Sequence, residues 1–472
     1  MADRPNILWI CSDQQRHDTI HALGNPHIRT PNLDRLVAEG VSFTHAFAQS
    51  PVCTPSRACF LTGRYPRTTR CRQNGQNIPA DEVLITRMLA DVGYDCGLVG
   101  KLHLSACDGR VEARIDDGYR VFHWSHHPNP DWAENAYIHW LEERGRKWED
   151  LYRKPPGDHV WPGVPAEFHQ TTWCAEKTIE FIRENRDGPW LMSVNPFDPH
   201  HPFDPPEEYL RRYDPSDVPA PTYRPGELDH KPVYQQVDHQ GAYGGHGLSS
   251  ARLSEHEHRR IVAAYYAMIE LLDDQVGRII EALEATGQRE NTIIIYMSDH
   301  GEMLGDHGIL LKGPYFYDCA IRVPLIMSWP GRFERGLRSD ALLELTDLPP
   351  TLLELCGMDV PERMQGKSFA CILTRDSPPN EHRDHVFCEY YNAMVGHNRA
   401  AHGTMIRDRD YKIAVYHGIQ AGELYDLLAD PGEFDNLWDS PDYRDLRTDL
   451  LKRCFDASVF TMDPMPPRIA AY

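Results

Sequence analysis

The sequence lacks any long hydrophobic run. A membrane-spanning helix needs about 18 or more consecutive apolar residues, and no stretch of the 472 residues reaches that length. The first apolar run, residues 6–11, is also too short for the core of a secretion signal and ends in Ser12 and Asp13. We therefore expect a cytoplasmic protein that has no membrane partner.

An excess of positive charge is also absent. The chain has 49 basic and 70 acidic residues, which gives a formal net charge of −21. Such a surface repels polyanions at long range, so nucleic acid is not expected as a partner. If the substrate is a small anion, the chain must instead build a local cationic pocket.

Paired cysteine motifs are missing as well. The 12 cysteines are scattered through a long chain, and no Cys-x-x-Cys pair has the matching histidine spacing of a structural zinc site. Their spacing does not suggest a disulfide framework either. Most of them are interpreted as buried thiols. The chain also has no internal repeat and no low-complexity tract.

Apolar runs alternate with helical patterns through the first three quarters of the chain. Such alternation favours an α/β domain with a large, mostly parallel sheet flanked by helices, which we assign to residues 1–375. A possible capping box of Ser254 and Glu257 opens the longest expected helix. Functional loops belong at the carboxyl ends of the strands. Strands are predicted at 7–11, 94–99, 190–194, 291–297 and 323–328, and helices at 31–39, 81–92 and 254–286.

The last part of the chain has a different pattern. Short strands at 386–390, 404–407, 411–416 and 423–426, followed by a helix at 443–455, predict a smaller C-terminal α+β domain with a short antiparallel sheet. We assign it to residues 376–472. Its Pro-rich end, residues 462–472, is the main indication of a homo-oligomer.

Long segments between the elements are rich in proline, histidine and aromatic residues. Residues 126–165 and 196–247 are interpreted as loops that shape a substrate site. Their aromatic side chains could stack on sugar or aryl rings or could serve ordinary packing. The aromatic residues considered lie in the wider ranges 121–173 and 196–247, and they are Trp124, Trp132, Trp140, Trp161, Trp173, Tyr234 and Tyr243.

Two predicted strands end in pairs of metal-binding residue types. Asp13 and Gln14 follow the first strand, and Asp299 and His300 follow the strand at 291–297. If both strands are central and parallel, the two pairs converge at one sheet edge. Two carboxylates, an amide and an imidazole suit a hard or borderline divalent ion. The alternative is that each Ser-Asp pair only caps a following helix.

Cys53 precedes a helical stretch that ends at Gly63. With Thr54 as N-cap and Pro55 as the first helical residue, Cys53 lies at a helix N-terminus. The free N–H groups there favour an anionic ligand or nucleophile. Arg57, one turn further on, adds a fixed positive charge. A lone cysteine is more often a small buried hydrophobic residue. A cysteine that opens a helix with the spacing Cys53-x-Pro55-x-Arg57 is much rarer than a lone cysteine.

These residues belong to a set of motifs that resembles the sulfatase family of the alkaline-phosphatase superfamily. The resemblance runs from about Pro5 to Leu437. It implies an alkaline-phosphatase-like fold and the oxidation of Cys53 to formylglycine by a formylglycine-generating enzyme. The motifs are Cys53-x-Pro-x-Arg57, Thr62-Gly-Arg-Tyr-Pro66, Gly100-Lys-x-His103, Pro199-His-x-Pro202, Asp299-His-Gly-Glu302, Lys312-Gly-Pro314, Glu423–Leu427 and Asp430–Glu433.

The resemblance also implies one divalent metal. Its ligands would be Asp13, Gln14, the formylglycine at Cys53, Asp299 and His300. Gln14 stands where many sulfatases have a second aspartate, and His300 where many have asparagine. Ca²⁺ is our first choice because oxygen ligands dominate, and Mn²⁺ is the alternative because of the imidazole.

Catalytic roles follow from the same resemblance. An oxygen of the hydrated aldehyde attacks sulfur, Arg57 and Lys101 offset negative charge, and His103 serves as the base that leads to sulfate release. His200 and Lys312 would stabilise or protonate the leaving oxygen. His201 competes with His200 for this role, and His307 either reaches the substrate or holds its loop. No role is assigned to His126, His127, His239 and His246. Arg64, Arg70 and Arg72 are candidates for recognising a further anionic group.

We expect an arylsulfatase-like sulfuric ester hydrolase that acts on a small-molecule or carbohydrate sulfate. The first alternative is a phosphonate monoester or phosphodiester hydrolase of the same superfamily, or an enzyme with both activities. A two-zinc phosphatase would need a serine or threonine nucleophile and more His and Asp ligands. A binding protein with an unconverted Cys53 is the non-enzymatic alternative.

Overall fold

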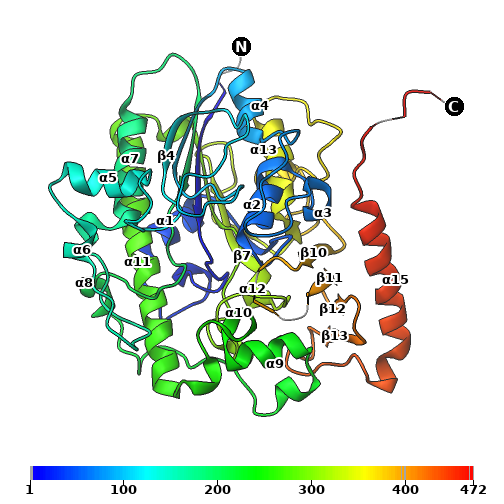
Figure 1. Cartoon of the computed structure of the whole chain (residues 1–472). Coiled ribbons are helices and arrows are strands. Elements are labelled where there is room, and N and C mark those ends of the chain that lie inside the picture. The colour runs from blue at the N-terminus through cyan, green and yellow to red at the C-terminus, as the bar shows by residue number, and fades with distance from the viewer. Residues whose placement is uncertain (1–3, 395, 398–399, 467, 471–472) are drawn as a thin grey trace.

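The computed structural model describes residues 4–394, 396–397, 400–466 and 468–470. Two sheets organise the chain, a nine-stranded sheet and a four-stranded sheet, with helices packed around them (Figure 1). The alkaline-phosphatase-like architecture expected from the sequence is confirmed. No helix in the described part of the chain is long and apolar enough to cross a bilayer.

The large sheet has the strand order β4-β3-β5-β1-β6-β7-β2-β8, and β9 also pairs with β2. The strands from β4 to β6 are parallel, whereas β7 runs antiparallel to both β6 and β2. The sheet is therefore mostly parallel, as predicted, but mixed on one side. Its strands are β1 Asn6–Ser12, β2 Val41–Phe47, β3 Asp95–Gly100, β4 Tyr119–Trp124, β5 Trp190–Asn195, β6 Thr292–Ser298, β7 Arg322–Ser328, β8 Leu337–Ser339 and β9 Leu343–Glu344.

The five predicted strands occur as β1, β3, β5, β6 and β7, with ends displaced by at most one residue. Strands β2, β4, β8 and β9 were not predicted. Polar side chains interrupt β2 and β4, as at Thr44 and His123, and β8 and β9 are only three and two residues long. These strands therefore lack the continuous apolar pattern of the central ones.

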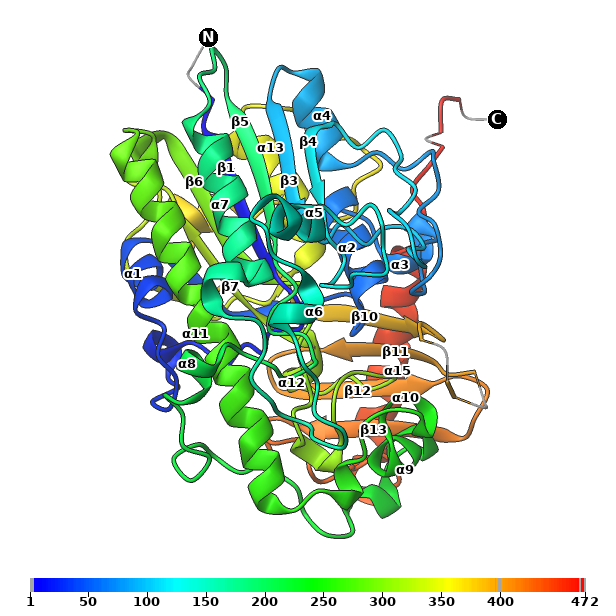
Figure 2. The same cartoon turned by 60° about the vertical axis from the view of Figure 1, so that its left-hand side comes forward.

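Alternate side chains of the central strands pack on opposite faces of the sheet. Ile7 and Trp9 join the core beneath α2 Cys53–Thr62, α4 Ile85–Asp91 and α13 Leu348–Leu355. Leu8 and Ile10 face the other layer, formed by α1 Pro31–Glu39, α5 Ala136–Glu143, α7 Gln170–Arg183 and α11 Glu255–Ala285. Figure 2 shows α7 and α11 crossing this face. Burial of both faces is what the continuous apolar strands predict.

The long helix α11 confirms the predicted capping box, since Ser254 is its N-cap and exchanges bonds with Glu257. The helix predicted at 81–92 is shorter, because it begins at Ile85. The segments interpreted as loops contain short helices, and α7 was missed. The shorter helices are α3 Pro66–Thr69, α6 Trp148–Leu151, α8 Glu207–Leu210, α9 Val233–Gln240, α10 Ala242–Gly245, α12 Asp318–Ile321 and α14 Ala370–Leu373.

Most aromatic residues considered for substrate stacking instead pack in the interior. Five of them, Trp124, Trp140, Trp161, Trp173 and Tyr234, are at most 3% exposed. Ordinary packing is therefore the correct interpretation for these five side chains.

The four-stranded sheet is antiparallel and lies between the large domain and helix α15 Arg444–Phe460 (Figures 1 and 2). One face packs on Phe316 and Tyr317, and the other on Leu450 and Cys454 of α15. The predicted C-terminal strands and helix are thus present. The domain boundary at 375/376 stays a prediction. The strands are β10 Val386–Tyr391, β11 His402–Arg407, β12 Tyr411–Tyr416 and β13 Ala421–Asp426.

Candidate active site

The register of β1 and β6 places the two aspartates side by side. The strands are parallel and pair from Asn6 with Thr292 to Ser12 with Ser298. Asp13 and Asp299 are the next residues of each strand, so both leave the sheet at the same edge. The Asp299 Oδ1 accepts hydrogen bonds from the backbone N–H groups of Gln14 and His300, both at 3.0 Å. The predicted convergence is therefore present.

Helix α2 delivers Cys53 to this edge, but its N-terminus differs from the prediction. The helix begins at Cys53, and Val52 is the N-cap, with an extended backbone at φ −137° and ψ 144°. Thr54 was the predicted N-cap. It is already helical, and its buried hydroxyl bonds to no described residue. Cys53 thus occupies the first helical turn, where the helix dipole favours an anion. The Thr54 N–H donates to Asn74 Oδ1 at 3.1 Å and the Ser56 N–H to the Val52 carbonyl at 3.2 Å, so the dipole and the nearby cations, rather than a row of free N–H groups, would stabilise the charge.

Four buried side chains converge beside this helix end. One donor atom from each of Asp13, Cys53, Asp299 and His300 lies within 4.8 Å of the others, and all four residues are at most 1% exposed. The carbonyl of Gly301 accepts a hydrogen bond from His300 Nδ1 at 2.8 Å, so the free lone pair of the ring is on Nε2. This nitrogen lies 3.1 Å from Cys53 Sγ. Orientation of a histidine through its second nitrogen is typical of metal ligands. The donors fit a divalent cation.

Gln14 lies at the rim of this cluster. Its amide oxygen accepts a hydrogen bond from Lys312 Nζ at 2.5 Å, and its amide nitrogen donates to the buried Glu302 carboxylate. Burial raises the pKa of Glu302. The predicted role of Gln14 as a metal ligand stays a prediction.

Two cations neutralise the carboxylates. Arg57 Nε donates to Asp299 Oδ2 at 2.8 Å, and Lys101 Nζ donates to Asp13 Oδ2 at 2.5 Å. Burial alone would raise the pKa of Asp13, but Lys101 and Arg57 hold it well below its usual range. Burial alone would also raise the pKa of the Cys53 thiol. The positive charges of Lys101 and Lys312 outweigh burial and lower this pKa to about 7. The cluster therefore stabilises negative charge at position 53.

A glycine directs Lys101 into the site. Gly100 ends β3 with φ +98°, and a Cβ there would lie 2.0 Å from the carbonyl oxygen of Asn195. That carbonyl accepts the Lys101 N–H at 2.9 Å, and the Asn195 side chain donates to the Lys101 carbonyl at 3.0 Å. Only glycine permits this close approach. The first residue of Gly100-Lys-x-His103 is thus required by backbone geometry.

Lys312 and His200 meet next to Cys53. Lys312 Nζ lies 3.2 Å from Cys53 Sγ and 2.8 Å from His200 Nε2. His200 Nδ1 donates to the carbonyl of His201 at 2.7 Å, so Nε2 is the acceptor that faces the lysine. Burial, together with Lys312, lowers the pKa of His200 well below its usual value. His200 is therefore a neutral imidazole whose Nε2 accepts a hydrogen bond from Lys312 Nζ.

The other two candidate histidines lie outside this pair. The His201 ring stacks on His200 at 4.2 Å, and burial lowers its pKa to about 3. His307 bonds to Glu227 at 2.8 Å and stacks on Tyr317 at 3.8 Å, so it holds its loop. The structure thus places His200, and not His201, in contact with Lys312.

His103 occupies a loop that a buried carboxylate anchors. Glu112 accepts hydrogen bonds from the backbone N–H groups of His103, Leu104 and Ser105 at 2.6, 2.6 and 3.0 Å. His103 has a left-handed backbone with φ 59°, a conformation that costs energy in a non-glycine residue. Burial and Lys101 lower its pKa well below the usual value. Glu112 escaped the sequence analysis because no motif marks it.

His126 was assigned no role, yet its ring lies 4.4 Å from that of His103 in an edge-to-face arrangement.

Arg64 and Arg70 were candidates for anion recognition. Arg64 is instead buried in ion pairs with Glu82 and Asp463, and Arg70 pairs with Asp81. Such paired arginines add no free positive charge to the site.

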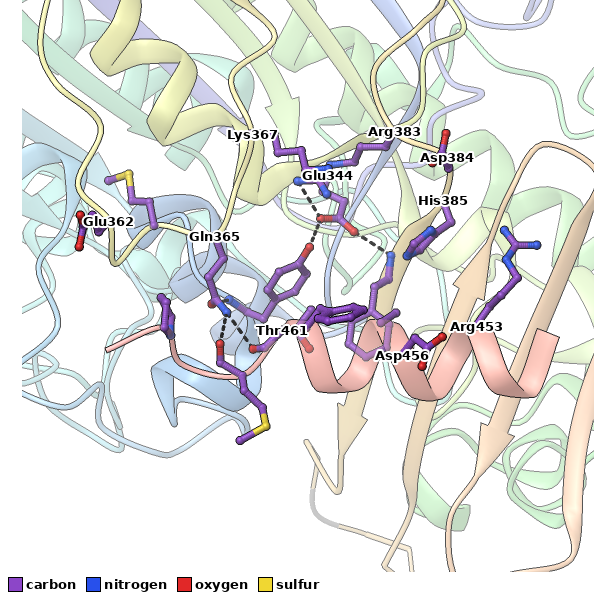
Figure 3. A pocket seen from close by; sticks show the side chains of 17 residues that line it. Glu344, Glu362, Gln365, Lys367, Arg383, Asp384, His385, Arg453, Asp456 and Thr461 are labelled. Carbon is purple, nitrogen blue, oxygen red and sulfur yellow. Dashed lines mark hydrogen bonds and ion pairs between the residues drawn. The ribbon is translucent and has the colours of Figure 1, made fainter. Parts of the chain in front are cut away.

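Among the cavities of the described residues, two differ in their relation to the candidate site. One of about 670 Å³ lies against α15 and is lined by residues such as Glu344, Arg383 and Thr461 (Figure 3). None of its lining residues is a candidate catalytic or metal residue. The other, of about 480 Å³, is lined by His126, His200 and aromatic side chains. The second cavity thus adjoins the candidate active site.

Comparison with known proteins decides the family. Residues 5–358 match the family described as Sulfatase, and residues 305–459 match the C-terminal part of N-sulphoglucosamine sulphohydrolase. This chain belongs to the sulfatase family of the alkaline-phosphatase superfamily. It is therefore a hydrolase of that superfamily, and a family that uses formylglycine and a divalent metal accounts for the buried cluster at Cys53.

Similar proteins include several activities. The sulfatase-family chain is 31% identical to the multifunctional alkaline phosphatase superfamily protein PehA of Trinickia caryophylli, over 95% of this chain and 94% of that protein. It is 28% identical to an arylsulfatase of Clostridium perfringens, over 95% and 93%. The phosphonate monoester hydrolase of Agrobacterium radiobacter has a similar structure, with a TM-score of 0.83, 29% identity and coverage of 98% and 97%.

Proposed function

We propose that this sulfatase-family hydrolase cleaves a sulfate monoester and releases sulfate and an alcohol or phenol. The observation that carries the proposal is the meeting of Arg57, Lys101 and Lys312 with the N-terminus of α2 around position 53. Fixed donors and cations of this kind bind a tetrahedral oxyanion and stabilise negative charge that develops during its transfer.

One divalent metal would be held by Asp13, Asp299, His300 and the residue at position 53, with Gln14 as a further candidate. Ca²⁺ is our first choice, and Mn²⁺ is the alternative because His300 offers a nitrogen. The metal would polarise a sulfate oxygen, and conversion of Cys53 to formylglycine would supply the hydrated aldehyde that attacks sulfur. A formylglycine-generating enzyme is the maturation partner that this requires.

The surrounding side chains bind and orient the substrate. Lys101 and Arg57 are held by Asp13 and Asp299, so neither cation must reorganise when the sulfate group arrives. Burial keeps water away from both cations and strengthens their interaction with an anion. His103 is neutral, so a ring nitrogen can accept the proton whose removal accompanies sulfate release.

Proton delivery to the leaving oxygen is assigned to the Lys312–His200 pair. His200 Nε2 accepts a hydrogen bond from Lys312 Nζ, because the His200 Nδ1–H donates to a carbonyl. The proton at Lys312 Nζ can thus reach the alcohol oxygen directly or through His200 Nε2. We favour His200 over His201 for this role.

The cavity of about 480 Å³ would hold the alcohol part of the substrate. It begins at His200 and is lined by Trp148, Tyr152 and Phe197, with Asp198 and Asp204 as carboxyl groups. Its volume lies within the range of small-molecule pockets. Aromatic walls with a few polar groups suit a single aryl or sugar ring.

A phosphonate monoester or phosphodiester is the second candidate substrate. It is favoured by the similarity to the Agrobacterium radiobacter phosphonate monoester hydrolase and to the multifunctional protein PehA. These esters have the same single negative charge and tetrahedral centre, so the same cations would accept them. The Gly100-Lys-x-His103 segment favours the sulfate ester, because it adds both a positive charge and a base.

The test compares 4-nitrophenyl sulfate with a 4-nitrophenyl phosphonate monoester on one preparation. Peptide mass spectrometry first establishes the converted fraction, since formylglycine formation lowers the peptide mass by about 18 Da. The metal content is then set with Ca²⁺ or Mn²⁺. We expect kcat/KM to be higher for the sulfate. A large preference for the phosphonate would establish the second candidate, and an unconverted Cys53 in protein from its native host would refute the mechanism.

A further inference from the structure

A second group of metal-binding side chains lies beside the proposed metal centre. His103, Cys107 and His126 each offer a ligand atom within 4.8 Å of the other two. None of the three belongs to the cluster of Asp13, Cys53, Asp299 and His300. His103 and Cys107 lie on the loop after β3, and His126 lies two residues after β4. We call these three residues the Cys-His₂ cluster.

The two imidazoles have nitrogen atoms without protein partners. His103 Nδ1 and His126 Nε2 are buried and bond to no described residue. The other His126 nitrogen, Nδ1, lies 2.8 Å from His127 Nδ1. Buried polar atoms nearly always have a partner, so unsatisfied ones indicate a missing ligand or ion. Each of the two rings thus carries a buried nitrogen without a described partner, and one nitrogen of each ring lies within 4.8 Å of the Cys107 thiol.

The scaffold holds this cluster in place. Glu112 anchors the loop through three backbone N–H groups and accepts a further bond from Trp124 Nε1 at 2.9 Å. Trp124 is the last residue of β4, the strand that leads to His126. One buried carboxylate therefore ties together both segments that supply the ligands. Preorganisation of this kind reduces the cost of metal binding.

We propose that the Cys-His₂ cluster is a binding site for Zn²⁺, separate from the proposed metal centre. A thiolate and two imidazoles are ligands that zinc prefers, whereas Ca²⁺ and Mg²⁺ require oxygen. Three protein ligands leave a fourth position open for water. Binding breaks the Cys107 S–H bond, forms a zinc–sulfur bond and releases one proton to solvent.

The local charges act on this ion in both directions. Burial and Glu112 raise the pKa of the Cys107 thiol to about 12, so zinc itself must displace the thiol proton. Burial lowers the pKa values of His103 and His126, so both rings are neutral and can coordinate metal. Lys101 opposes a cation at this place. The thiolate formed at Cys107 offsets part of that repulsion, and the carboxylate of Asp13 is paired with the lysine.

Zinc at this site would inhibit hydrolysis. This consequence rests on the proposed function, in which His103 Nδ1 or Nε2 accepts a proton. A zinc-bound His103 has lost that lone pair or its freedom to reorient. The Cys-His₂ cluster would then make the enzyme sensitive to Zn²⁺ even when the proposed metal centre holds its own ion.

The binding test uses Co²⁺ as a spectroscopic probe in the Cys53→Ala background, with excess Ca²⁺ present, so that position 53 offers no thiol. We expect a cobalt–thiolate charge-transfer band that Zn²⁺ abolishes, and its loss in Cys107→Ser. Cys371→Ser is the matched control, because Cys371, like Cys107, is a partly buried thiol and is not part of the Cys-His₂ cluster. Failure of Co²⁺ to produce the band, or its persistence in Cys107→Ser, would overturn the proposal.

The activity test uses the converted enzyme with saturating Ca²⁺ or Mn²⁺. Loss of one of three ligands should raise the Zn²⁺ concentration for half inhibition at least about tenfold in Cys107→Ser and leave it unchanged in Cys371→Ser. His126→Asn serves as a second variant if Cys107→Ser folds poorly. Equal inhibition of both cysteine variants contradicts the inference. Because the cobalt band needs no turnover, a failed sulfatase proposal and a failed zinc site give different results.

Discussion

Replacement of Lys312 by methionine removes a cation that contacts both Cys53 and His200. Lys312 Nζ lies 3.2 Å from Cys53 Sγ, and the residue is 2% exposed. At an effective dielectric constant of about 20, a unit charge at this distance interacts with a full negative charge by about 5 kcal/mol. Rearrangement and entry of water would recover part of it. We therefore expect Lys312→Met to lower kcat by roughly 10²- to 10³-fold.

The assay measures kcat and KM with 4-nitrophenyl sulfate and with phenyl sulfate, normalised to the formylglycine content. If Lys312 supplies the proton to the leaving oxygen, the loss is larger for phenyl sulfate, because phenolate needs protonation more than 4-nitrophenolate does. A structural role alone would lower the activity on both substrates equally.

Lys231→Met is the matched control. Lys231 is a buried lysine that bonds to Tyr425 and the carbonyl of Glu433, and no candidate site residue is among these partners. Its loss should reduce stability and leave kcat per folded molecule unchanged. A Lys312→Met enzyme that retains kcat within threefold of the parent would refute the assigned role.

Three further predictions concern the metal, the interior and the surface. Asp299→Asn should weaken metal binding at least about tenfold by removing a carboxylate, as measured by calorimetry; unchanged affinity excludes Asp299 as a ligand. Arg383→Met leaves the buried Asp347 without the arginine that holds its pKa low, and should cost about 3–5 kcal/mol at pH 8. In the parent this contribution is complete above the ordinary Asp pKa of about 4 and is lost below it. In the variant the Asp347 carboxyl keeps its contact with His382 at 3.2 Å but loses the guanidinium, so it takes up a proton more readily. The difference in Tm should therefore narrow toward pH 5; a constant difference contradicts this. Phe460→Glu should lower the mass found by light scattering if α15 forms an oligomer contact, since Phe460 is 83% exposed; an unchanged mass excludes that contact.

The central strands were predictable because both of their faces are buried. Ile7–Cys11 and Ile293–Met297 are continuous apolar runs of strand length, and every residue of the two strands is buried. The sequence pattern of each run therefore indicates a strand with both faces covered. Strand β2 contains Ser42, Thr44 and His45 and depends on its pairing with β7 for its conformation. Such a strand is stabilised by tertiary contacts that a local pattern does not contain.

The candidate site was predictable where residues follow directly on strands or open a helix. Asp13 and Asp299 leave the neighbouring strands β1 and β6, and Lys101 leaves β3, which β5 separates from β1. All four strands are parallel, so their pairing alone brings these residues to one edge. Glu112 and His126 could not be found in this way. Their positions depend on how the loop after β3 folds back against β4, which no spacing in the sequence encodes.

The balance of charge explains how so acidic a protein could bind an anion. Arg57, Lys101 and Lys312 contribute three positive charges around position 53, while Asp13 and Asp299 contribute two negative ones. A divalent cation would raise this local sum to +3. A sulfate monoester brings one negative charge, so the centre retains positive charge to stabilise the oxygen that becomes anionic during transfer. The formal net charge of the whole chain is −21, and the repulsion from distant surface charges is screened beyond roughly 8–10 Å at physiological salt. Binding therefore depends on these buried cations and not on long-range attraction, and KM should change little with ionic strength.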